Sequence, residues 1–372
     1  MHHKSQMSGL AQRLLRLCLY PLSLVFFIGS VQAAEGGMAL HLSQQSTEKV
    51  ALDVGLVIFN PGIPPDASTH SKLGIFPEIR KSEAKFMPVI LRQVLINSGA
   101  WGVVRVLPEP LEASELLLTG KILQSNGLRL AIQVQVHDAS GRRWLDKVYV
   151  DETTASDYPV TGGGDPYMDL YRQIANELLT LKQSLSGKQQ QDIRNVALMR
   201  YASSLSPEVF GDYLARTEGG MYKLARLPAD GDPMMARVDR IRNQEYLFID
   251  TVDEQYAKLY EEMAPTYNLW REYGREQALY TATYQDRVAQ RERRGRRGTY
   301  AAMEQTYDAY KWSKIHEQDL DDLALGFNNE VAPTVMEVSG KVFRLNGTLD
   351  SQYTEWRNIL REIFVLETGL TP

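Results

Sequence analysis

Six arginines concentrate positive charge near the middle of the second half of this 372-residue chain. They are Arg287, Arg291, Arg293, Arg294, Arg296 and Arg297, in a chain whose net charge is −5. Like charges held this close repel one another, which favours contact with anionic lipid headgroups, an acidic polysaccharide or an acidic protein partner. The alternative is a solvated tip of a helical hairpin, with the glycines of the run making the turn.

Four tyrosines in a helical stretch form a second candidate surface. Tyr260 and Tyr267 are seven residues apart, and so are Tyr273 and Tyr280. Seven-residue spacing puts each pair on one helix edge, whereas the six-residue step between the pairs breaks the phase. Tyrosine suits a half-wet interface because its ring packs while its hydroxyl stays hydrated. We expect two short tyrosine edges on the helix, each of which a partner helix from this chain or from a second copy could cover. The alternative is that these tyrosines pack in the core of the protein.

The sequence offers no recognisable catalytic constellation. His316-Glu317 has no second histidine four residues on, as a zinc protease helix requires, and His137 lies on the polar side of a strand. The chain after residue 33 holds neither a Gly-x-Ser-x-Gly elbow nor a cysteine. We therefore predict no catalytic, cofactor-binding or metal-binding residue.

Two further motifs resemble binding loops but lack the residues that such loops need. The glycines at 162–164 are not followed by the Gly-Lys-Ser/Thr of a phosphate loop. Asp319, Asp321 and Asp322 with Glu317 lack calcium-loop spacing and a turn glycine. We interpret the first as a lead-in to a helix and the second as a solvated helix face.

Residues 1–33 have the pattern of a secretory signal peptide. Lys4, Arg13 and Arg16 precede the apolar run Leu17 to Val31, and Val31-Gln32-Ala33 presents small residues to a signal peptidase. An uncleaved anchor is the alternative, but the apolar run is shorter than the roughly 20 residues that cross a bilayer. We predict export by a cleaved signal, and a periplasmic or outer-membrane-associated mature protein that is more acidic than the whole chain.

The hydrophobic patterning predicts an α+β protein of three regions after a polar leader at 34–49. Residues 50–190 alternate strands and helices and contain an antiparallel or mixed sheet with two helices; the segment from Leu128 to Val136 alternates strictly between apolar and polar residues. Residues 191–330 read as aromatic-rich helix, hairpin-like or coiled-coil-like, with Pro265 expected to bend or interrupt it. Residues 331–372 read as a small ββα unit.

Two segments resemble known envelope modules. Residues 50–185, with VALDVGLVIF, WGVVRVL and LLLTGKI in that order, resemble the N-terminal α+β domain of periplasmic TolB proteins. The ending VMEVSGKVFRLNGTLDSQYTEWRNILREIF is similar to the second half of a BON domain, a periplasmic module associated with envelope attachment. The whole chain also looks like a family of secreted bacterial proteins without an assigned role.

These resemblances imply a non-enzymatic binding or scaffolding component of a periplasmic or outer-membrane assembly. We expect envelope protein partners, contact with anionic lipid or polysaccharide as an option, a homo-oligomer as another, and no nucleic acid. The competing hypothesis is a cell-wall or polysaccharide hydrolase that uses carboxylates. A polar cleft with converging acids would favour that enzyme.

Overall fold

The computed structural model describes residues 37–43, 51–111, 114–161, 164–293 and 333–369. For residues 71–72 and 284–293 it describes the backbone alone. The predicted signal peptide and most of the polar leader lie outside these residues. The described residues from Met38 onward belong to one compact unit.

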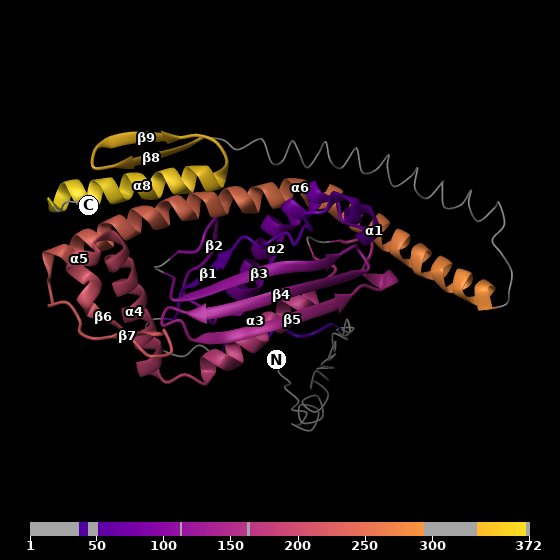
Figure 1. Ribbon diagram of the computed structural model, residues 1–372, viewed down its shortest axis with the longest axis horizontal. Helices are drawn as coiled ribbons and strands as arrows, with labels where there is room; N and C mark the ends of the chain where they lie inside the picture. Colours follow the sequence, from indigo (N-terminus) through magenta and orange to yellow (C-terminus); the bar gives the residue numbers. More distant parts are fainter. Residues whose placement is uncertain (1–36, 44–50, 112–113, 162–163, 294–332, 370–372) are drawn as a thin grey trace, which may run out of the picture. The chain divides into compact units, whose positions relative to one another are not determined.

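A five-stranded mixed sheet forms one layer of this unit, in the order β2-β1-β3-β4-β5 (Figure 1). β1 (Val54–Val57) lies between β2 (Val104–Leu107) and β3 (Leu116–Ser125) and runs parallel to both. β3, β4 (Arg129–Asp138) and β5 (Arg143–Glu152) form an antiparallel meander. The predicted mixed sheet is therefore confirmed.

The strict alternation of β4 places one face of the sheet in the core. Leu130, Ile132, Val134 and Val136 are fully buried, whereas the intervening Gln133 and Gln135 are half-buried. Because successive side chains of a strand point to opposite faces, this pattern leaves the second face wet. The apolar face packs against helices in the largest hydrophobic cluster of the described residues.

Two helices cover that apolar face, as the sequence predicts. α2 (Pro77–Asn97) follows β1 and contributes Leu91 and Leu95, and α3 (Met168–Gln183) follows β5 and contributes Leu170 and Ile174. α2 begins at Pro77, in the first turn of the helix, where a proline needs no N–H partner. Pro88 lies inside the helix.

The region predicted to be wholly helical also contains a small hairpin. After α4 (Gly187–Leu205) and α5 (Pro207–Phe210), β6 (Leu214–Arg216) pairs with β7 (Tyr222–Leu224). The hairpin forms because Gly220 adopts a positive φ of 77° in the turn, while Leu214 and Tyr222 pack against the main cluster. The remaining short elements are α1 (His70–Leu73) and three single 3₁₀ turns (Ala67–Thr69, Ala155–Asp157 and Gly211–Tyr213).

α6 (Pro233–Arg293) is a single helix of 61 residues that continues through Pro265. Of the two predicted effects of this proline, a bend or an interruption, the interruption is wrong, and its neighbours on the helix explain why. Met263 and Tyr267 flank it and pack with Ile79 and Phe86 of α2, so tertiary contacts hold the helix where the proline removes a backbone hydrogen bond.

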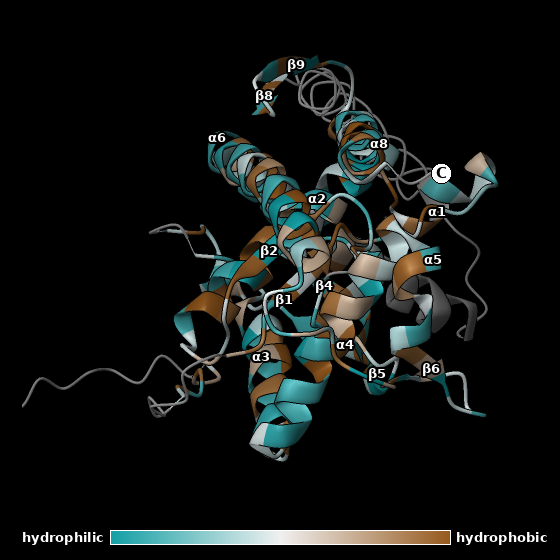
Figure 2. Ribbon diagram, turned by 90° about the vertical axis from the view of Figure 1, so that its left-hand side faces the viewer, coloured by the Kyte–Doolittle hydropathy of each residue, from teal (hydrophilic) through white to brown (hydrophobic). Residues whose placement is uncertain are grey.

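The C-terminal ββα unit forms as predicted. β8 (Thr334–Val338) pairs with β9 (Lys341–Leu345), and α8 (Leu349–Thr368) lies beside the first half of α6 (Figure 1). Phe248 of α6 stacks with Tyr353 and Trp356 of α8 at centroid distances of 5.8 and 6.3 Å. Both helices mix hydrophilic and hydrophobic residues along their length, as expected for helices with one buried face (Figure 2).

Candidate functional site: the distal part of the long helix

The first predicted tyrosine edge is covered from within the chain. The rings of Tyr260 and Tyr267 lie 5.4 and 5.7 Å from that of Phe86 on α2, and the Tyr267 hydroxyl donates a 2.8 Å hydrogen bond to Glu83 Oε1. Tyr267 is 6 % exposed. This pair is thus an internal contact between α6 and α2.

The second pair turns to solvent, as the phase break requires. Six residues advance an α-helix by about 240°, and Tyr273 and Tyr280 are 49 % and 41 % exposed where Tyr267 is buried. Leu269, at 54 % exposed, lies four residues before Tyr273 on the same side of the helix. We call Leu269, Tyr273 and Tyr280 the distal stripe. Continuing the three-and-four spacing from Tyr273 in both directions would have found Leu269.

α6 continues for 18 residues beyond Arg275, where it meets the turn of a sheet hairpin. The turn of the β3–β4 hairpin contacts α6 at Arg271 and Arg275. The contact is so close that a Cβ atom added to Gly127 would lie 2.0 Å from Arg271 O and 2.6 Å from Arg275 N. Residues 276–293 then extend the helix by about 27 Å. From 276 to 283 every side chain but that of Ala278 is exposed. We call residues 276–293 the distal arm.

Part of the predicted arginine cluster lies on the last turns of this arm. The backbones of Arg287, Arg291 and Arg293 belong to α6, while their side chains lie outside the described atoms. Arg294, Arg296 and Arg297 lie outside the described residues, as do Glu317, Asp319, Asp321 and Asp322. Their predicted roles stay predictions.

A buried polar cluster fixes the base of the arm, and sequence reasoning missed it. Arg271 is 1 % exposed; its guanidinium donates to Asp165 Oδ2 at 2.8 Å and stacks 4.3 Å from the centroid of Tyr267. Beside it Arg80 and Glu83 form a second buried ion pair, 3.0 Å between Nε and Oε2. Asp165 and Arg271 are 106 positions apart in the sequence, so no pattern among neighbouring residues predicts that they pair.

The cluster has the character of a structural anchor. Its charges pair as two cations and two carboxylates, since a buried charge is tolerated only with a partner of opposite sign. The coulombic influence of Asp165 raises the pKa of Arg271 against the opposing effect of its burial. For the neighbouring tyrosines burial acts in the other direction: it raises the pKa of Tyr171 and Tyr267 well above the usual value, so these phenols stay protonated.

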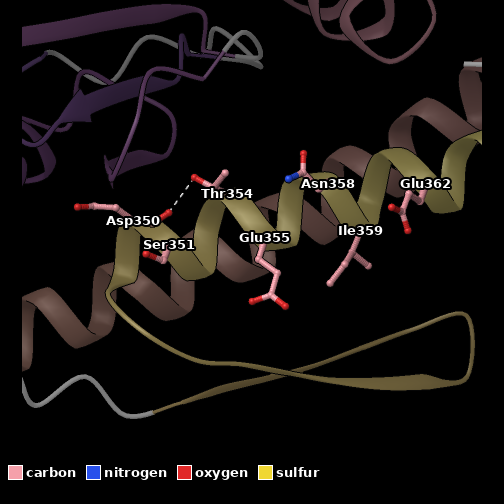
Figure 3. A pocket seen from close by; sticks show the side chains of 7 residues that line it. All are labelled: Asp350, Ser351, Thr354, Glu355, Asn358, Ile359 and Glu362. Atoms are coloured by element: carbon pink, nitrogen blue, oxygen red, sulfur yellow. Dashed lines mark hydrogen bonds between the residues drawn. The ribbon is translucent and has the colours of Figure 1, made fainter.

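An open acidic hollow lies on the outer side of α8. It has a volume of about 600 Å³ and is lined by residues that include Asp350, Thr354, Glu355, Asn358 and Glu362. Figure 3 shows Asp350 and Thr354 on one side of the helix and Glu355 and Glu362 on the other. Glycoside hydrolysis needs two carboxyl groups that face one bond, and these carboxylates diverge. The hydrolase hypothesis gains no support from this surface.

Neither a metal site nor a membrane-spanning helix is found among the described residues. In that part of the chain, no group of three or more His, Cys, Asp or Glu side chains is placed to hold a metal ion. Over the same residues, no helix combines the length and apolar character needed to span a membrane. Comparison with protein-family models and with curated proteins found no match for this chain.

Proposed function

We propose that the protein is an exported cell-envelope protein that binds or scaffolds partners in a periplasmic or outer-membrane assembly through the distal arm. The arm carries the proposal because α6 continues for 18 residues past Arg275, a position that meets the turn of the sheet hairpin. Most helical stability in proteins comes from the packing of one helix face against other elements. A partner that covers the arm would supply that packing.

The composition of the arm favours a protein partner. Residues 276–283 read EQALYTAT and include a single charged side chain, Glu276. Leu279 and Tyr280 are 39 % and 41 % exposed. Depletion of charge together with exposed aromatic and aliphatic groups distinguishes the centre of protein interfaces from ordinary surface. The arginines at residues 287–297 add positive charge beside this segment and would steer an acidic partner to it.

The body of the protein fits a carrier of such an arm. The Arg271 cluster and the close approach of Gly127 hold the base of the arm against the sheet. A rigid base presents the arm in one direction, which lowers the entropy lost when a partner binds. The predicted export signal supports an envelope location and comes from the sequence alone.

Site-specific crosslinking tests this proposal. A photo-reactive amino acid is placed at Thr283, on the arm, or at Lys188, an exposed position on α4, and the full chain is expressed in its own bacterium. We expect one discrete adduct from Thr283 that is absent from Lys188. Equal labelling at both positions, or no adduct at Thr283, would contradict a binding role for the arm.

A vesicle assay distinguishes a lipid from a protein partner. The variant carrying Arg293→Ser, Arg294→Ser, Arg296→Ser and Arg297→Ser is sedimented with anionic phospholipid vesicles beside the wild type, at low and at moderate salt. A protein partner predicts weak sedimentation of both proteins. Strong wild-type sedimentation that falls with salt and is lost in the variant would show the anionic lipid surface to be the ligand.

A further inference from the structure

The main sheet has one closed edge and one open edge. At the closed edge, β2 is short, and Arg92 Nε donates to Val104 O at 3.2 Å. The carboxylate of Asp253 on α6 accepts a further hydrogen bond from the backbone of Val106. At the other edge, β5 is ten residues long and pairs with β4 alone among the strands of the described chain (Figure 1). An exposed edge strand is a template for pairing with another chain.

The β4–β5 ladder shows which backbone groups of β5 point outward. Thr153 N donates to Leu128 O at 2.9 Å, and the antiparallel register continues from there along the strand. Because the N–H and C=O groups of successive strand residues point to opposite sides, those of Asp146, Val148 and Val150 point away from β4. We call these three residues the open edge.

The side chains around the open edge leave room for a second strand. Val148 and Val150 are 47 % and 41 % exposed, on the face of β5 that turns away from α3. On the α3 side, Lys147 Nζ and the Tyr149 hydroxyl each donate to Glu177 Oε2 at 2.8 Å. A lysine on an edge strand ordinarily opposes pairing. Here Glu177 draws Lys147 toward α3 and neutralises its charge.

The charges along β5 favour an identical strand in the antiparallel direction. Arg142 and Arg143 stand at the start of β5, and Asp151 and Glu152 stand at its end. Arg143 and Glu152 are 62 % and 63 % exposed, so a second chain can reach both. Antiparallel pairing of two copies brings the basic end of each strand to the acidic end of the other, whereas parallel pairing would bring like charges together.

We infer that β5 pairs antiparallel with β5 of a second copy of this chain, across a twofold axis at Val148. In this register Val148 faces Val148, and Asp146 faces Val150 on both sides of the axis. Each of these three pairs exchanges two hydrogen bonds, so the open edge is fully satisfied. Lys147 of each copy faces Tyr149 of the other. The two five-stranded sheets become one continuous sheet.

Single cysteines test the position of the axis in the full chain, in a Cys18→Ser background because Cys18 is its one cysteine. Val148→Cys places two cysteines on the axis with their Cα atoms about 5.5 Å apart, within the range of a disulfide. Val150→Cys is the matched control, because it is similarly exposed but two such cysteines would lie about 14 Å apart.

We expect a disulfide-linked dimer from Val148→Cys on a non-reducing gel, with at least about fivefold less from the control. Equal yields from the two variants would indicate random collision and overturn the inference. A higher yield from Val150→Cys would overturn the register centred on Val148.

Analytical ultracentrifugation tests the pairing without a cysteine. We expect the wild type to pass from monomer to dimer as its concentration rises, and Val148→Lys to stay monomeric because it puts two like charges on the axis. Leu123→Lys is the control and should dimerise as the wild type does, since Leu123 is 44 % exposed on β3, an interior strand.

Two results of the centrifugation would overturn the inference. A wild type that is monomeric at every concentration would leave the open edge to a strand of a different protein. A dimer that survives Val148→Lys would place the interface elsewhere. The β5 contact involves no residue of the distal arm, so neither result bears on the binding role proposed for the arm.

Discussion

At the scale of single residues, the fold shifts the pKa of the Glu115 carboxyl group. Its Oε2 atom accepts a 3.0 Å hydrogen bond from Asp53 N and lies 3.7 Å from Arg194 Nε. Burial raises the pKa of Glu115 to about 7, against the opposing influences of that backbone hydrogen bond and of Arg194. Glu115 thereby joins β1 and the start of β3 to α4 in a pH-dependent contact.

The sign of this pH dependence follows from the direction of the shift. A carboxyl whose pKa is higher in the folded state than in the unfolded state stabilises the fold below its unfolded pKa. That contribution is lost as the pH rises from about 4.5 through about 7. Glu115→Gln removes the titration, so its free energy of unfolding should rise relative to wild type over this range, by on the order of 2–3 kcal/mol.

Urea unfolding between pH 4.5 and 8.5 checks this prediction. Glu152→Gln is the control, because Glu152 is 63 % exposed in its pairing with Arg129, and it should leave the pH profile unchanged. A difference between Glu115→Gln and wild type that stays constant with pH would show that Glu115 titrates normally in the folded protein.

The buried pair of Arg271 and Asp165 yields a second residue-scale prediction. Asp165→Asn keeps an oxygen that can accept the 2.9 Å hydrogen bond from Tyr167 N but leaves Arg271 as an unpaired buried charge. We expect a loss of about 3 kcal/mol in the free energy of unfolding. Arg129→Ala, which breaks an exposed pair, should cost less than about 1 kcal/mol. Similar losses in both variants would mean that the buried pair stabilises the fold no more than the exposed pair does.

At the scale of elements, the β3–β4 hairpin and α6 meet backbone to backbone. Gly127 has a φ of +79°, and a Cβ at this position would lie 2.0 Å from Arg271 O. Asn126 O approaches the helix at Gly274, where a Cβ would lie 2.9 Å away. Two glycines therefore permit the contact that sets the base of the distal arm.

Gly127→Ala should separate the hairpin from the helix. Gly141→Ala is the matched control, because Gly141 has a φ of +87° in the neighbouring hairpin and its Cβ would have no neighbour nearer than 3.9 Å. The control should lose about 1 kcal/mol from the left-handed backbone alone. Gly127→Ala should lose at least about 2 kcal/mol more, with faster amide exchange in α6 near Arg271. Equal losses would contradict the close approach.

Element-scale prediction from the sequence worked where periodicity is local. The alternation from Leu130 to Val136 predicted the buried face of β4, and the helical pattern within residues 191–330 predicted the long helix α6. It failed at Pro265 and at the β6–β7 hairpin. In both places contacts with distant residues outweigh the local preference, and a pattern confined to neighbouring residues does not contain those contacts.

At the scale of the whole molecule, the predicted division at 190/191 and 330/331 can be tested by cooperativity. The two largest clusters share Tyr260, Leu214 and Leu224 as packing neighbours, and the described residues from Met38 onward belong to one compact unit. We expect one unfolding transition in urea, with coincident midpoints from far-UV circular dichroism and tryptophan fluorescence. Trp101 reports the first cluster and Trp356 the second. Two separated transitions would favour independent domains.

The candidate site also shows that local sequence patterns do not contain contacts between distant residues. The sequence placed Tyr260, Tyr267, Tyr273 and Tyr280 on two edges, and only the tertiary structure decided that α2 covers the first edge and that the second is exposed. The acidic hollow on α8 had no sequence signal, because its acids come from a helix face that ordinary solvation also explains.

The sequence by itself determined the α+β class, the mixed sheet of residues 50–190 and the helical character of the long segment, because each depends on residues a few positions apart. Only the tertiary structure decided which polar side chains meet inside the protein. Asp165 with Arg271 and Glu83 with Tyr267 are 106 and 184 positions apart. Their pairing reflects the cost of burying a charge or hydroxyl without a partner, and that cost arises only once the fold has removed the water.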